Sequence, residues 1–135
     1  MFGPTANVGT TQVFRVTIDN NTPYNTSTDD TNPEHYRQWY QSPQLSEGTH
    51  NITFDQLDGE ALDYILVAPG PQTPLAGATL MIDDTYNGIK YSDGWQSVQN
   101  STYAKSSIIP GSNFMNTTHQ TSTAGDSLTF SYTGM

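Results

Sequence analysis

Aromatic side chains with polar neighbours are the feature of this sequence best suited to binding a ligand, and they favour a carbohydrate. Sugars present flat C–H faces that stack on aromatic rings, while nearby amides and carboxylates bind their hydroxyl groups. The aromatic candidates are Trp39, Tyr40 and Trp95. The polar candidates are Gln38, Gln41 and Asp93. The alternative is a role in the hydrophobic core, although Trp39 and Tyr40 would point to opposite faces of a strand over 36–42, so that only one could be core.

Two adjacent aspartates, Asp83 and Asp84, follow a short apolar run and could supply hard oxygen ligands to a structural calcium ion. The alternative is a solvated turn whose carboxylates cap the end of a strand. The sequence favours the turn, because neighbouring strand residues point to opposite faces and the chain has no Asp-x-Asp-x-Asp-Gly loop. No other cofactor is expected.

The three histidines, His35, His50 and His119, are too far apart in the sequence to form a short metal-binding motif. His50 is in phase with Ile52 and Phe54, which predicts a hydrogen-bonded structural histidine. His119 is expected either to pack within the fold or to contact a sugar.

Catalytic motifs are not apparent in the chain. It contains no cysteine, no Gly-x-Ser-x-Gly and no glycine-rich phosphate loop after a strand. We therefore expect no catalysis. A glycoside-active enzyme stays open as a third alternative, because a pair of catalytic carboxylates is defined by its separation in space rather than in sequence.

Five N-glycosylation sequons predict an extracellular surface carrying sugar. Their asparagines are Asn20, Asn25, Asn51, Asn100 and Asn116. The opening Met1-Phe2-Gly3-Pro4 lacks the basic start and apolar stretch of an export signal. We therefore expect this chain to be part of a longer secreted or membrane-anchored precursor.

The net charge and the hydropathy of the chain exclude several classes of binding partner. Lys and Arg number 4 against 13 Asp and Glu, a net charge of −9, which disfavours nucleic acids and anionic membranes. No apolar run approaches the roughly 18 residues that span a bilayer, so direct membrane insertion is not expected.

Short runs of alternating apolar residues predict an all-β protein, an antiparallel β-sandwich forming a single domain over 1–135. Strands are expected over 13–18, 36–42, 50–54, 62–66, 80–82, 89–91 and 128–132. The turn-rich segment 20–34 is predicted to be an exposed loop, and the proline-rich segment 68–79 a linker.

Two groups of segments resemble a known family. IDDTYNGIKYSDGW (82–95) and TSTAGDSLTFSYTG (121–134) resemble the first half of extracellular domains found in uncharacterised fungal surface proteins. FRVTIDN (14–20), YRQWYQSPQLSEGTHNITF (36–54) and LDYILV (62–67) resemble the second half. Those domains are galactose-binding-like jelly rolls, commonly in tandem and often followed by a membrane span.

The two halves stand here in reversed order. The resemblance therefore implies either a circular permutant or a segment cut across two tandem domains, with residues 1–67 and 80–135 as the exchanged halves. A permutant can fold because domain termini usually lie close together at the surface. We expect the strand at 127–133 to lie near residues 1–6, in a monomer or a domain-swapped dimer.

These observations predict a noncatalytic extracellular module that binds carbohydrate through its loops. The second hypothesis is a purely structural, glycosylated ectodomain spacer of a cell-surface protein. The third is the glycoside-active enzyme.

Overall fold

Antiparallel β-strands make up the regular structure of the chain. The computed structural model describes residues 1–3, 11–29, 37–57, 61–99 and 113–134. Within these ranges there are twelve strands and one 3-10 helix, η1 (Phe114–Asn116), and no α-helix. The strands are β1 (Phe2–Gly3), β2 (Thr11–Ile18), β3 (Tyr24–Asp29), β4 (Arg37–Gln38), β5 (Gly48–Leu57), β6 (Ala61–Leu62), β7 (Tyr64–Val67), β8 (Leu80–Asp83), β9 (Ile89–Tyr91), β10 (Gln96–Gln99), β11 (Thr117–Gln120) and β12 (Asp126–Gly134). The predicted all-β class is confirmed.

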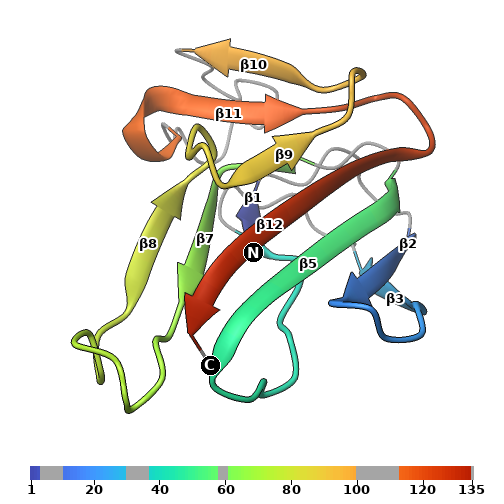
Figure 1. Cartoon of the computed structure of the whole chain (residues 1–135). Coiled ribbons are helices and arrows are strands. Elements are labelled where there is room, and N and C mark those ends of the chain that lie inside the picture. The colour runs from blue at the N-terminus through green and yellow to red at the C-terminus, as the bar shows by residue number, and fades with distance from the viewer. Residues whose placement is uncertain (4–10, 30–36, 58–60, 100–112, 135) are drawn as a thin grey trace.

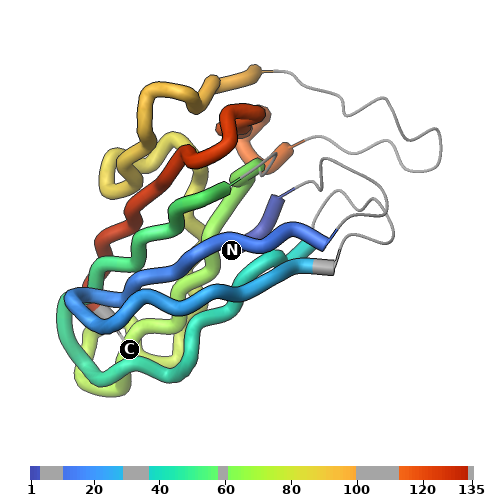
Figure 2. The backbone as a smooth tube through the Cα atoms, turned by 90° about the vertical axis from the view of Figure 1, so that its right-hand side faces the viewer, coloured from blue at the N-terminus to red at the C-terminus, as the bar shows by residue number. Residues whose placement is uncertain are grey.

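The largest sheet has five strands in the order β3-β2-β5-β12-β9, and all of its pairs are antiparallel. Its longest ladder joins β5 to β12, which lie side by side across the centre of Figure 1. Figure 2 shows β12, β5, β2 and β3 following one another across this sheet. Strands from both ends of the chain therefore build one sheet.

Two smaller sheets complete the fold. One has the order β4-β1-β7-β8, and the other has the order β10-β11-β6. The pairs in both are antiparallel. In Figure 1 the β10–β11 pair lies at one end of the molecule, above β9.

The core lies where the inner faces of the five-stranded and four-stranded sheets meet. One continuous cluster of buried side chains includes Phe14, Val16 and Ile18 of β2, Ile52 and Phe54 of β5, Leu128 and Phe130 of β12, and Ile65 and Val67 of β7. The predicted alternation of β2 is confirmed, because Phe14, Val16 and Ile18 are buried while the residues between them are more exposed. This layering is consistent with a β-sandwich.

Three polar segments differ from the sequence prediction. The predicted loop over 20–34 contains β3, which pairs with β2 from Tyr24 to Asp29. β10 and β11 lie in a stretch with no predicted strand. The predicted strand over 36–42 is reduced, in the described residues, to Arg37 and Gln38.

The proline-rich segment 68–79 is a series of turns that closes an antiparallel hairpin between β7 and β8.

The expected proximity of the strand at 127–133 to residues 1–6 can be examined only for residues 1–3, which are described. Met1 and Phe2 line the same cavity as Phe130 and Tyr132, while β12 itself pairs with β5 and β9. Residues 4–6 lie outside the described residues.

No helix within the described ranges is long and apolar enough to cross a membrane.

Candidate functional site

The three aromatic side chains expected to stack on sugar are instead part of the core. Trp39 and Tyr40 are 4% and 7% exposed, and Trp95 is 9% exposed. The expectation that only one of Trp39 and Tyr40 could be buried was wrong, because β4 ends at Gln38 and the strict alternation of a strand ends with it. Both rings then pack edge-on against Phe54. None of the three offers an open stacking face.

Trp95 is also fixed by its polar end. Its Nε1–H donates to the Ser127 carbonyl at 2.9 Å, and its ring lies 5.0 Å from that of Tyr91. A buried indole with a satisfied N–H is the usual arrangement of a structural tryptophan. Asp93, two residues earlier, is exposed in the turn between β9 and β10.

A cavity of about 540 Å³ lies between the sheets, and three of the predicted polar and aromatic candidates line it: Gln38, Tyr40 and Gln41. Its other lining residues are Met1, Phe2, Ser42, Pro43, Gln44, Ile52, Ile65, Leu66, Val67, Ala68, Thr79, Phe130 and Tyr132. This volume is within the range of small-molecule sites. No Asp, Glu, Lys, Arg or His side chain is among these residues, although the chain carries a net charge of −9. The cavity is therefore suited to a neutral occupant.

Tyr40 joins the cavity to the edge of the five-stranded sheet. Its hydroxyl and that of Tyr24 on β3 form a 2.7 Å hydrogen bond, and burial, followed by this bond, raises the pKa of Tyr40. The Met1 amino group donates to the Tyr40 carbonyl at 2.8 Å, and burial lowers its pKa to about 5, which favours the neutral amine at pH 7. At the rim, Gln38 Nε2 donates to Gln41 Oε1 at 3.4 Å. The polar groups at this end of the cavity thus hold one another in place.

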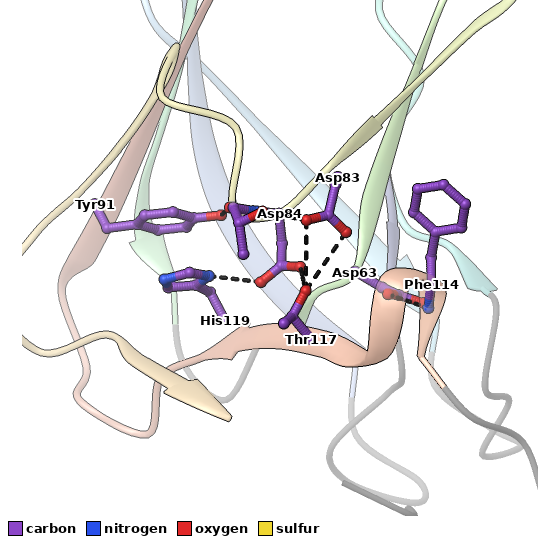
Figure 3. Close-up of polar contacts among 8 residues, drawn as sticks. Asp63, Asp83, Asp84, Tyr91, Phe114, Thr117 and His119 are labelled. Carbon is purple, nitrogen blue, oxygen red and sulfur yellow. Dashed lines mark hydrogen bonds and ion pairs between the residues drawn. The ribbon is translucent and has the colours of Figure 1, made fainter. Parts of the chain in front are cut away.

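A second group of candidates, Asp83, Asp84 and His119, meets at the end of β8 (Figure 3). His119 Nδ1 and Asp84 Oδ2 form a 2.6 Å hydrogen bond, and the Thr117 hydroxyl donates to Asp84 Oδ1 at 2.7 Å. The same hydroxyl lies 3.4 Å and 3.5 Å from the two Asp83 oxygens. Both aspartates can face Thr117 because β8 ends at Asp83.

Asp83 and Asp84 differ in exposure. Asp83 is half-buried and its Oδ2 accepts hydrogen bonds from the Thr85 N–H, at 3.2 Å, and the Thr85 hydroxyl, which is the predicted turn cap. Asp84 is fully buried, so the expectation of a solvated turn was wrong for this residue. Burial raises the pKa of Asp84, while its bonds to Thr117 and His119 act in the opposite direction.

The ring of Tyr91 stacks on the imidazole of His119, with 4.1 Å between the ring centres and 6° between the planes. The Tyr91 hydroxyl donates to the Asp84 carbonyl at 2.9 Å, and burial raises its pKa. Figure 3 shows the two rings one above the other beside Asp84. Packing, one of the two predictions for His119, is therefore confirmed.

Asp63 is a fully buried carboxyl beside this cluster that the sequence analysis did not single out. Its Oδ1 accepts from the Phe114 N–H at 2.9 Å, whereas its Oδ2 has no hydrogen-bond partner among the described residues. Burial, together with the nearby charges of Asp84 and Asp83, raises the pKa of Asp63 to about 7. The signal available in the sequence was an aspartate inside the apolar run of 61–67.

The calcium site considered as the alternative at Asp83 and Asp84 has no ligand set in the described part of the chain. There, no group of three or more His, Asp or Glu side chains is arranged to hold a metal ion. The oxygens of Asp83 and Asp84 are instead occupied by threonine and histidine donors.

His50 has the structural role predicted for it. It is buried, and its two ring nitrogens face two acceptors, Asp19 Oδ2 at 2.9 Å and the Ser46 carbonyl at 2.8 Å. Two acceptors require two N–H donors, so this geometry favours the imidazolium form. The hydrogen bond to Asp19 raises the pKa of His50.

Four of the five sequon asparagines lie in the described ranges, and all four are exposed: Asn20, Asn25, Asn51 and Asn116. Asn25 lies on the edge strand β3 and Asn51 on the central strand β5. Asn100 and His35 lie outside the described residues.

Comparison of this chain with protein-family models, with curated proteins and with solved structures finds no match in any of the three.

Proposed function

We propose that this chain is a noncatalytic structural module of a glycosylated extracellular surface protein. The observation that carries the proposal is the burial of Trp39, Tyr40 and Trp95. Every ring predicted to stack on sugar is part of the hydrophobic core. The exposure of all four described sequon asparagines supports it, since an acceptor asparagine must be reachable at the surface.

The proposal also includes a more specific fold than the all-β class. A jelly-roll, galactose-binding-like sandwich with its halves in permuted order, or cut across tandem repeats, is supported by the antiparallel sheets and their shared core. It is also supported by the family resemblance of the segments that form β2, β5 and β12. Fold alone assigns no ligand, so a spacer role follows from the site rather than from the architecture.

Secretion of the chain from a eukaryotic host behind an added signal peptide tests the proposal. We expect a mass increase that an N-glycosidase removes, and a stepwise loss of mass in Asn25→Gln and Asn51→Gln. Asn21→Gln is the matched control, because Asn21 is exposed but has Pro23 where an acceptor asparagine needs Ser or Thr, and the change keeps the sequon of Asn20 intact. A secreted, folded chain without N-linked sugar would contradict the proposal.

Carbohydrate binding is the second candidate, favoured by the neutral cavity where Gln38, Tyr40 and Gln41 come together. Glutamine amides at the rim could bind hydroxyl groups while the apolar floor contacts the C–H faces. A glycan array with the purified chain tests it: binding that is lost in Gln41→Ala supports this candidate, and an array without bound sugars counts against it. The glycosidase alternative gains no support here, because no carboxylate is among the described residues that line the cavity.

A further inference from the structure

The outer face of the five-stranded sheet carries uncharged polar side chains where β5 and β12 pair. Ile52 and Phe54 of β5, and Leu128 and Phe130 of β12, are buried in the core, so the residues that alternate with them face outward. We call the paired outward residues the hydroxyl face: Thr49, Asn51, Thr53, Thr129, Ser131 and Thr133. All of them carry a hydroxyl or an amide.

Cross-strand hydrogen bonds order this face. The pairs are Thr49 with Thr133, Asn51 with Ser131, and Thr53 with Thr129. The two hydroxyls of the first pair lie 3.0 Å apart, and those of the last pair 2.9 Å apart. A hydroxyl can donate once and accept twice, so each threonine pair keeps a free hydrogen and free lone pairs for a ligand. Such groups lie on both sides of Asn51 along the strands.

Asn51 is held at the centre of the hydroxyl face by its backbone and by its side chain. Its N–H donates to Asp19 Oδ1 at 2.9 Å, and its carbonyl accepts from the Asp19 N–H at 2.7 Å. Its Oδ1 accepts from the Ser131 hydroxyl, whereas its Nδ2 has no hydrogen-bond partner among the described residues. An N-linked sugar is joined to Nδ2, and the amide keeps its Oδ1 when that bond forms. The contact with Ser131 is therefore compatible with glycosylation.

The other described sequon asparagines have different surroundings. Asn20 lies in the turn after β2, Asn25 lies on the edge strand β3, and Asn116 ends η1. Asn51 lies on β5, which is paired with β2 on one side and with β12 on the other. A sugar at an edge or in a turn extends into solvent, whereas a sugar on Asn51 begins above the middle of a sheet.

The chemistry of the hydroxyl face suits a neutral sugar. Outward residues lie about 7 Å apart along a strand, and neighbouring strands lie about 5 Å apart, so both threonine pairs are within reach of the first sugars on Asn51. Threonine hydroxyls can exchange hydrogen bonds with sugar hydroxyls, while threonine methyl groups contact C–H faces. Beyond Thr53, the charges of Arg15 and Asp55 are paired at 2.7 Å.

We propose that the hydroxyl face binds the first sugars of an N-linked glycan on Asn51, and that this contact stabilises the five-stranded sheet. The inference rests on the proposed function, which supplies the glycan, and deepens it by giving one glycan a binding surface on the protein. Glycans on the other asparagines make no such contact.

The test compares the Tm of the parent chain, Asn51→Gln and Asn25→Gln. Each is secreted from the eukaryotic host with its glycans and also produced in bacteria without them. The glycan gain is the Tm of the secreted form minus that of the bacterial form, which cancels the effect of the substitution itself. We expect Asn51→Gln to lower the gain by at least about 2 °C, the size of one net hydrogen bond in a chain of this length, and Asn25→Gln to leave it unchanged.

The outcomes separate this inference from the proposed function. Equal gains in all three chains, with sugar on Asn51 shown by mass spectrometry, would overturn the inference and leave the proposed function standing. Sugar on other asparagines but none on Asn51 would do the same. A secreted, folded chain without any N-linked sugar would overturn both.

A further variant tests the hydroxyl groups directly. Thr49→Val, Thr129→Val and Thr133→Val, combined in one chain, remove hydroxyls on both sides of Asn51 and keep Thr53, which the sequon needs. Valine keeps the β-branched shape, so the bacterial form should fold with a Tm near that of the parent. We expect the secreted form to carry sugar on Asn51 and to lose at least half of the glycan gain. An undiminished gain would show that these hydroxyls do not bind the sugar.

Discussion

Replacement of Asp63 by asparagine should stabilise the protein above neutral pH and have little effect in acid. Asp63 is fully buried, and its Oδ2 has no hydrogen-bond partner among the described residues. Asparagine keeps the carbonyl oxygen that accepts the Phe114 N–H and removes the ionisable group. The variant therefore isolates the free-energy cost of a negative charge at this position.

The size of the effect follows from the pKa of Asp63, which burial raises from 3.8 to about 7. Below about pH 3 the carboxyl is protonated in both the folded and the unfolded chain, and its ionisation costs no stability. Between about pH 4 and pH 7 only the unfolded chain loses the proton, so the free energy of unfolding falls as pH rises. At 1.36 kcal/mol per pKa unit, the loss is at most about 4 kcal/mol, and it stays constant above pH 7.

The assay is urea unfolding of the parent chain and Asp63→Asn at pH 3 and pH 8. We expect matching midpoints at pH 3 and, at pH 8, a gain for the variant of about 1–4 kcal/mol. Asp93→Asn, at an exposed aspartate, is the matched control and should change neither value. A loss of stability in Asp63→Asn at pH 8 would refute the reasoning, because it would mean that the folded protein stabilises the ionised carboxylate.

Three further substitutions test the core and its polar contacts. His50→Gln should lower the free energy of unfolding at pH 5, where the imidazolium bridges Asp19 and Ser46. Because the pKa of His50 is raised, this deficit should shrink as pH rises through that pKa, and an equal deficit at pH 5 and pH 9 would contradict the proposed charge state. Trp39→Ala should cost about 3–5 kcal/mol in urea unfolding, whereas a loss within about 0.5 kcal/mol would place its ring outside the core. Gly3→Ala should lower the Tm, since its Cβ would lie 1.9 Å from the Ala61 carbonyl oxygen, and an unchanged Tm would show that the backbone shifts freely here.

Strands with a clear apolar alternation could be predicted from sequence because one of their faces is buried. Phe14, Val16 and Ile18 on β2, and Leu128 and Phe130 on β12, follow the two-residue period. The structure buries these side chains in a common core. The period is a direct consequence of covering one face of a sheet, so it can be read without knowledge of the partner strand.

The polar strands could not be predicted in this way. β3 has the sequence YNTSTD, and β11 has TTHQ. Their place in a sheet comes from backbone pairing with a neighbour, β3 with β2 and β11 with β10 and β6, rather than from an apolar face of their own. Pairing with a distant segment leaves little trace in the local sequence.

The candidate site shows a similar division. The chemistry of Asp84 and His119 was visible as residue types, but their 2.6 Å contact joins residues 35 positions apart in the chain. For Trp39 and Tyr40, the prediction assumed that the strand continued to 42. Because β4 ends at Gln38, both rings are buried and the stacking surface is lost. A difference of a few residues in one strand end thus decides the role of both rings.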